Sequence, residues 1–176
     1  MPSATVIYSN TLSATTNSVS ITSIPSTYKH LWLQVSARSA DFGDWFECGI
    51  NGSTTGSDYF SRLIYWDLGG TTGSTGTQVP AAGTTPLTGP INYSTSLANS
   101  YSNASVMFFN YAASGNVKVF TGTGGQNNSA TPSRQVFWDN RNNAITTAIT
   151  SIQFRVQTST ANSIGAGTTL TLYGLP

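Results

Sequence analysis

Residues 31–38 read Leu-Trp-Leu-Gln-Val-Ser-Ala-Arg, an alternation in which every second side chain is apolar and small or aliphatic. Leu31 and Leu33 fall on one side of an extended chain and Trp32 and Gln34 on the other, because successive side chains of a strand point to opposite faces. This pattern is typical of a half-buried strand. The stretch therefore predicts a sheet with one face on a core and the other on solvent or a partner.

The same period of two recurs along the chain and defines the expected fold. Alternating runs lie at 18–22, 46–50, 117–120, 152–157 and 169–173, and further strands are expected at 4–9, 60–67, 104–111 and 134–139. In the run at 117–120, Val117 and Val119 are the aliphatic positions, alternating with Lys118 and Phe120. No long segment has the helical period with caps. About nine or ten strands joined by polar turns predict an all-β, jelly-roll-like antiparallel β-sandwich.

Turn signals divide these strands. Asn51-Gly52 follows an alternating run and predicts a two-residue hairpin turn. Residues 113–116, Ala-Ser-Gly-Asn, lie between two strand-like runs and predict a second hairpin.

One long stretch departs from this regularity. Residues 69–90 read GGTTGSTGTQVPAAGTTPLTGP, without charge and rich in Gly, Thr and Pro. We expect a structureless excursion within a single domain spanning 1–176, reaching over a neighbouring subunit. The alternative is a flexible linker between two domains. Residues 1–16 are a candidate N-terminal arm.

The charge content limits the classes of function. Charged residues make up 7% of the 176 residues, with one His and one Cys. Enzymes mostly work through ionisable side chains, so this composition favours a structural or binding protein over a catalyst. The net charge is +1 and the charges are scattered, without the basic stripe of a nucleic-acid binder. No stretch approaches the roughly 20 apolar residues of a membrane helix. We therefore expect neither nucleic acid nor a membrane as partner.

Residues with catalytic or metal-binding chemistry are sparse. Asp41 and Asp44 come closest to a calcium site but lack the ligand density of a recognised loop. Glu47 is the only Glu, and glycan hydrolysis needs two carboxylates across a cleft. A Ser-His-Asp triad would have to use His30, but the chain has no Ser in a Gly-x-Ser-x-Gly turn. We expect Cys48 to be a small buried residue. We expect no catalytic residue, no metal ligand and no cofactor.

Aromatic side chains are the remaining functional signal, at 11% of the chain. Outward-facing rings on a sheet stack on sugar rings or anchor a protein interface, whereas inward-facing rings belong to the core. Trp32 and Trp45 are most clearly out of phase with the aliphatic face. The candidates for a protein interface or for glycan stacking are Trp32, Trp45, Trp66, Tyr59 and Trp138.

Several segments resemble virion structural proteins of tailed bacteriophages, particularly those of cyanobacteria and other aquatic hosts. The main one is 20–38, in which a Ser/Thr-rich strand is followed by Ile-Pro, Tyr-Lys-His-Leu, an alternating strand and Arg38. The other matching segments are 50–52 with Tyr59, 149–152, Gly167-Thr168 and 172–175. These are strand and turn residues, so the resemblance concerns fold and ancestry.

The resemblance implies a β-sandwich subunit of a phage particle. Such proteins serve as capsid decoration (cement) proteins or as modules of tail fibres, and decoration proteins often form trimers. From this we expect a non-enzymatic homotrimer, made in the host cytoplasm, that binds the major capsid protein on the outer surface of the head. The alternative is a tail-fibre or receptor-binding module that recognises host glycans.

Overall fold

The computed structural model describes residues 3–41, 45–53, 56–68, 74–78, 87–92, 96, 99–126, 133–157 and 163–176. These residues form twelve strands and one short 3-10 helix, η1 (Gly56–Asp58). The strands are β1 (Thr5–Thr11), β2 (Ser18–Ile21), β3 (His30–Ala37), β4 (Trp45–Ile50), β5 (Tyr59–Leu68), β6 (Ser74–Gln78), β7 (Leu87–Pro90), β8 (Ser102–Phe108), β9 (Lys118–Gln126), β10 (Ser133–Asn142), β11 (Ile152–Val156) and β12 (Thr169–Leu175).

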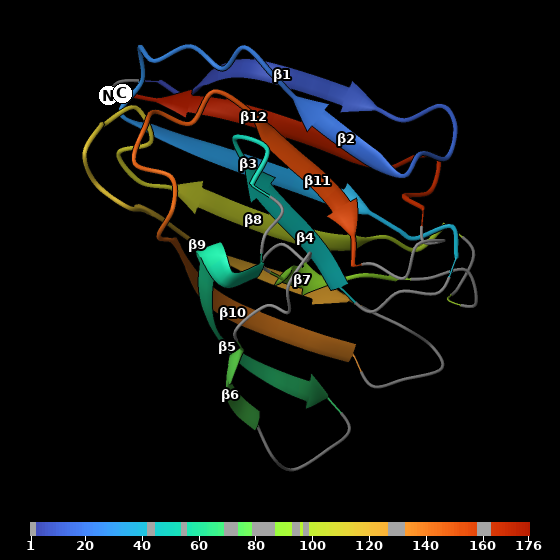
Figure 1. Cartoon of the computed structure of the whole chain (residues 1–176). Coiled ribbons are helices and arrows are strands. Elements are labelled where there is room, and N and C mark those ends of the chain that lie inside the picture. Colours follow the sequence, from blue (N-terminus) through green and yellow to red (C-terminus); the bar gives the residue numbers. More distant parts are fainter. Residues whose placement is uncertain are drawn as a thin grey trace.

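The strands form two antiparallel sheets that pack face to face (Figure 1). The large sheet has eight strands in the order β1-β12-β3-β8-β9-β10-β5-β6, and the small sheet has four in the order β2-β11-β4-β7. The expected all-β sandwich is therefore confirmed.

The strand order matches a jelly roll. The chain crosses between the sheets in the order β1, β2, β3, β4 and then β7, β8, β11, β12. These eight strands place β1-β12-β3-β8 in one sheet and β2-β11-β4-β7 in the other. The four remaining strands are two insertions, β5-β6 and β9-β10. They extend the large sheet beyond β8, so this sheet is much wider than the small sheet facing it.

The core lies between the sheets and follows the period of two. In β3, Leu31 and Leu33 are fully buried, whereas Trp32 and Gln34 on the opposite face are half-buried. Phe46 of β4 and Phe154 of β11 contact each other from neighbouring strands, with ring centroids 4.8 Å apart. The aliphatic periodicity therefore assigned the inward face of these strands correctly.

The start of β9 has the opposite orientation from the one its valines predict. Lys118 and Phe120 are buried, whereas Val117 and Val119 are 42% and 40% exposed. The ring of Phe120 stacks on that of Phe108 in the neighbouring strand, with centroids 5.0 Å apart. A large aromatic side chain buries more apolar area than a valine, and this outweighs the buried Lys118.

The turn at Asn51-Gly52 forms, but it joins different strands from those expected. Both residues have positive φ, 47° and 71°, and the Ser53 amide donates to the Ile50 carbonyl at 2.9 Å. This is the local geometry of a tight primed turn. β4 and β5 nevertheless lie in different sheets, so the predicted two-residue hairpin is wrong. The second expected hairpin is confirmed, because β8 pairs with β9 across residues 109–117.

The uncharged stretch 69–90 is not wholly irregular. Its residues 74–78 form β6 at the edge of the large sheet, and 87–90 form β7, which pairs with β4. Residues 69–73 and 79–86 lie outside the described part of the chain. The candidate N-terminal arm is likewise a strand of its own chain, since β1 pairs with β12.

Candidate interaction surface

The side of the large sheet that faces away from the small sheet is its outer face. The strand register aligns the side chains of this face in rows across the strands. One row contains Val6, Tyr173, Trp32, Met107, Thr121, Asp139 and Arg62, and the next contains Ser9, Thr171, Gln34, Ser105, Thr123, Phe137 and Ile64. The small sheet packs on the opposite side of the large sheet, so none of its strands covers the outer face.

The inserted strands carry an apolar patch on the outer face, formed by Phe60, Ile64, Val119 and Phe137, which the Arg62–Asp139 pair divides into two halves. Phe137 of β10 lies directly opposite Ile64 of β5, and the two are 49% and 43% exposed. Phe60 and Val119 are 39% and 40% exposed and flank Arg141 from the two neighbouring strands. Clusters of exposed apolar side chains, unlike single ones, mark interaction sites.

Charge on this part of the face is largely neutralised within the face itself. Arg62 and Asp139 are cross-strand neighbours, and Arg62 donates from both Nε and Nη2, the shorter bond being 2.7 Å. This hydrogen bond, together with the Asp139 charge, raises the pKa of Arg62. The Arg141 guanidinium lies 6.0 Å from the centroid of the Phe60 ring, at the limit of a cation–π contact. Each cation therefore already has a favourable neighbour within the chain.

The jelly-roll half of the outer face carries an aromatic pair, Trp32 and Tyr173. Their ring centroids are 5.3 Å apart at an interplanar angle of 34°. The Oγ of Ser105 accepts hydrogen bonds from Trp32 Nε1 and from Gln34 Nε2, both at 2.8 Å. These bonds hold the indole in a defined orientation, which lowers the entropy cost of using it in a contact.

The five aromatic candidates occupy different environments. Trp32 lies on the outer face as described, and Trp45 lies at the margin between the sheets, where Arg134 is 5.5 Å from its ring centroid. Tyr59 and Trp138 are 1% and 5% exposed in the core, so neither presents its ring to a partner. The side chain of Trp66 lies outside the described residues.

Tyr59 is a structural residue at the start of β5. Its hydroxyl accepts a hydrogen bond from the Ile50 amide at 3.2 Å and donates to the Ser53 carbonyl at 3.1 Å. Burial raises the pKa of this phenol. The Tyr59 hydroxyl therefore connects β5 to the turn after β4, and this role accounts for the burial of Tyr59 in the core.

The sparse ionisable groups also have structural contacts. Glu47 is fully buried and accepts a hydrogen bond from Arg155 Nε at 2.7 Å, directly across the β4–β11 pair. Asp41 accepts from the Ser163 amide at 2.9 Å, and His30 Nδ1 accepts from the Asn110 amide at 3.1 Å. Asp44 lies outside the described residues.

The described residues contain no group of three or more His, Cys, Asp or Glu that could hold a metal ion. They also contain no helix long and apolar enough to cross a membrane.

No protein-family model matches the chain, and no curated protein matches it.

The alternation along the sequence singles out Trp32 but not the apolar patch. The signal was present, because Ile64 and Phe137 each alternate with positions that are buried, such as Leu63 and Val136. In both runs apolar residues occupy inward and outward positions, and the period of two then gives no contrast between the faces. A run with apolar residues at both inward and outward positions indicates a strand whose outer side is also apolar.

Proposed function

We propose that this protein is a non-enzymatic structural subunit of a phage particle, most concretely a decoration protein that binds the major capsid protein on the outer surface of the head as a homotrimer. The observation that carries the proposal is the outer face of the large sheet. It is broad, poor in net charge and apolar at the inserted strands. Support for the phage assignment comes from the resemblance of 20–38, and the jelly-roll strand order is compatible with it.

The energetics of the apolar patch favour a protein partner. Complete burial of a large apolar side chain contributes about 1.5–3 kcal/mol, so covering the exposed 39–49% of each patch residue contributes about 1 kcal/mol. The Arg62–Asp139 pair satisfies its own hydrogen bonds, so a partner need not replace them. A neutral protein surface with apolar side chains complements such a face better than a charged polymer does.

Co-sedimentation of the purified chain with heads of the phage that encodes it tests this proposal. The matched variants are Ile64→Lys on the apolar patch and Ser20→Lys, which adds the same charge at an exposed position of β2 in the other sheet. We expect the wild type and Ser20→Lys to sediment with heads and Ile64→Lys to remain in the supernatant. Equal binding by both variants, or binding to isolated tails alone, would contradict the proposal.

The aromatic pair supports a second candidate function, a receptor-binding module for host glycans. An indole fixed by Ser105 beside a phenol, with Gln34 and Thr171 as neighbours, offers both a stacking surface and hydrogen-bonding groups. Glycan-array binding that disappears in Trp32→Ala, with an unchanged circular dichroism spectrum, would favour this function. Absence of any array signal would favour the decoration protein.

A further inference from the structure

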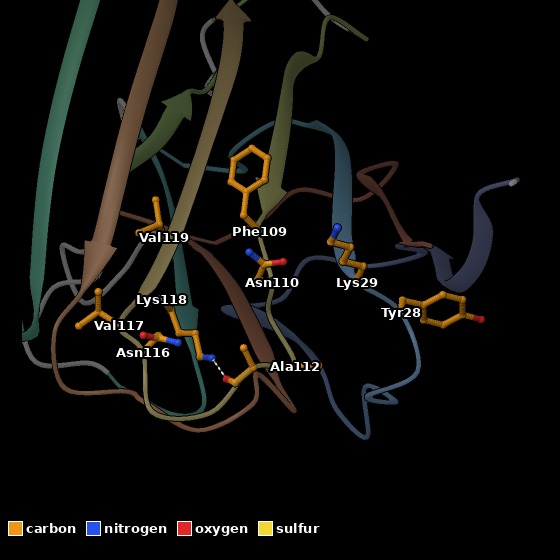
Figure 2. A pocket seen from close by; sticks show the side chains of 10 residues that line it. Tyr28, Lys29, Phe109, Asn110, Ala112, Asn116, Val117, Lys118 and Val119 are labelled. Atoms are coloured by element: carbon orange, nitrogen blue, oxygen red, sulfur yellow. Dashed lines mark hydrogen bonds between the residues drawn. The ribbon is translucent and has the colours of Figure 1, made fainter. Parts of the chain in front are cut away.

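The pocket beside the β8–β9 connection is maintained by contacts within the chain (Figure 2). Lys118 is 2% exposed, and its ammonium donates a hydrogen bond to the Ala113 carbonyl. Val117 and Val119 point to the opposite side of the chain from Lys118, so the side chains around this pocket do not converge on one ligand. A different feature, the edge of the large sheet at β1, offers backbone groups that no described strand binds.

β1 is an open edge of the large sheet (Figure 1). It lies at one end of the strand order and pairs with β12, and no described strand pairs with its other side. It is the longest of the four edge strands, with seven residues against five in β6 and four each in β2 and β7. An edge of this kind presents a row of backbone N–H and C=O groups that a strand of another chain can bind.

The usual protection of an open edge is weak in β1. Native edge strands are shielded from pairing by charged side chains, by Pro, by bulges or by being very short. β7 is short and ends in Pro90, whereas β1 contains neither a charged residue nor Pro, and the first charged side chain of the whole chain is Lys29. One irregularity near the start of β1 leaves the pairing of 8–11 with β12 regular, and residues 9–11 are exposed. The second half of β1 is therefore open to a partner strand.

The backbone groups of Ser9 and Thr11 point to the free side of β1. The amide and carbonyl of Leu12 both bond toward the β12 side, at 2.9 and 2.8 Å, and this direction alternates along an antiparallel strand. Ser9 and Thr11 also contact the opposite residues of β12 through their hydroxyls, at 3.3 and 3.0 Å. Such close side-chain contacts are typical of the pairs that exchange no backbone bonds. The amides and carbonyls of Ser9 and Thr11 are thus available to a second strand.

We propose that β1 pairs antiparallel with β1 of a second copy of this chain, about a two-fold axis at Asn10. In this register Ser9 of one copy faces Thr11 of the other, and each such pair exchanges both of its backbone hydrogen bonds. The hydroxyl pairs of the outer face then continue from β12 and β1 into β1 of the second copy. Tyr8 lies opposite Leu12 of the second copy, which joins two half-buried side chains that already pack on the core.

The edge is complementary to itself in this register more than in its neighbours. The amide of Asn10 both donates and accepts hydrogen bonds, so the two copies of this side chain match across the axis. An axis at Ser9 would instead place Thr11 opposite Ile7 of the second copy, where the pairing of β1 is irregular. The net charge of +1 gives only weak repulsion between two copies. A second copy is therefore the partner that fits this edge.

This two-fold contact goes beyond the proposed decoration function. An edge that pairs with its own symmetry mate joins two copies only, so the proposed homotrimer must use other surfaces, and the β1 contact would then join neighbouring trimers. The apolar patch lies on the inserted strands, beyond β8 in the large sheet. Variants that break the β1 pairing are therefore expected to leave the trimer and its binding to heads intact.

Disulfide cross-linking of cysteine variants tests the pairing and its register. Asn10→Cys places two thiols opposite each other in a pair without backbone bonds, whose Cα atoms are about 4.5 Å apart, within the range of disulfides. The native Cys48 is buried and does not compete. In an oxidising glutathione buffer we expect Asn10→Cys to give a linked dimer on a denaturing gel. Ser9→Cys, whose counterpart is displaced along the strand, and Ser20→Cys, at an exposed position of β2, should remain mostly monomeric.

Two results of the cross-linking would contradict the proposal. Equal cross-linking of Asn10→Cys and Ser20→Cys would indicate random collision and overturn the pairing. Stronger cross-linking of Ser9→Cys than of Asn10→Cys would overturn the register with Asn10 at the axis.

Charge complementation at the axis tests the same pairing without a covalent bond. Asn10→Lys and Asn10→Asp each place like charges opposite each other, and each should weaken self-association in sedimentation velocity about fivefold or more. An equimolar mixture of the two variants should recover association, because opposite charges then face each other. Ser20→Lys adds a charge away from β1 and should associate like the wild type. Asn10 is exposed, so its variants leave the core undisturbed.

The sedimentation experiment has three outcomes that would overturn the two-fold pairing. These are a wild type that does not self-associate, association of Asn10→Lys equal to that of the wild type, and a mixture that associates no better than its components. None of them bears on the decoration function, which the co-sedimentation with heads tests separately.

Discussion

Two glycines of β9 provide a matched test of how the inserted strands pack on the jelly roll. A Cβ added at Gly122 would overlap the Ser105 carbonyl oxygen and the indole of Trp138, which is 5% exposed in the core. A Cβ at Gly125 would meet its nearest atoms, the Arg134 carbonyl oxygen and Asn103 Oδ1, at 3.6 Å, an ordinary contact. Neither glycine has a positive φ, so backbone strain is the same in both variants.

The expected effects therefore differ in sign. Neither the backbone oxygen nor the packed indole can move away cheaply, so Gly122→Ala should lower the free energy of unfolding by about 2–3 kcal/mol. Gly125→Ala should raise it by about 0.4–1 kcal/mol, because alanine restricts the unfolded chain without a clash in the folded one.

Urea unfolding followed by tryptophan fluorescence measures both changes, provided that the m-value stays constant. Loss of less than about 0.5 kcal/mol in Gly122→Ala would show that β9 does not pack under Trp138 in this register. An equal loss in Gly125→Ala would refute the reasoning, since the two positions would then be alike.

Three further predictions concern the core and the buried ionisable groups. Leu33→Ala should cost about 2–5 kcal/mol in urea unfolding, because Leu33 is fully buried between the sheets; a change below about 0.5 kcal/mol would place it outside the core. Arg155→Met should cost about 3–5 kcal/mol by removing the ion partner of the buried Glu47, whereas Arg62→Met at the exposed pair should leave the free energy of unfolding nearly unchanged; similar losses would contradict this contrast. Burial raises the pKa of Cys48 from 9.0 to about 12, so the stability from its neutral thiol is complete below pH 9 and is lost as pH rises toward 12, at up to about 1.4 kcal/mol per pH unit. Cys48→Ala should show a smaller decline of unfolding free energy between pH 9 and 11 than the wild type; parallel declines would contradict the burial.

The sandwich was predictable because its strands alternate cleanly. Leu31 and Leu33, or Ile152 and Phe154, mark one inward face each, and two such faces define a layered core. The insertions into the large sheet were not predictable in the same way. β6 reads Ser-Thr-Gly-Thr-Gln and joins the sheet through backbone pairing to β5, which needs no apolar pattern of its own.

Turns show a similar division between local and long-range information. Asn51 and Gly52 adopt the positive φ values that their residue types favour, and this is a local property. Which strands the turn joins, however, depends on contacts with distant segments. The side chain of Asn51 accepts hydrogen bonds from the amides of Thr150 and Ser151 and donates to the Ala148 carbonyl, and these contacts to a distant segment stabilise a crossing between the sheets.

The candidate site was predictable only in part. Trp32 stands out because it is a large ring on the polar side of a clear alternation. The orientation of β9 was not predictable, because Lys118 follows Val117 and precedes Val119, and a lysine between valines normally indicates a solvent-facing position. Burial of Lys118 depends on the aromatic stacking of Phe120 on Phe108, a contact between strands that single-sequence periodicity does not contain.

A cryo-electron microscopy reconstruction of the intact phage tests the central claim most directly, because it locates both the chain and its covered face. Our account predicts density for the sandwich on the outer surface of the head, with Ile64 and Phe137 of the outer face against a neighbouring protein. Density confined to the tail, or a sandwich on the head whose outer face is open to solvent in every copy, would contradict it.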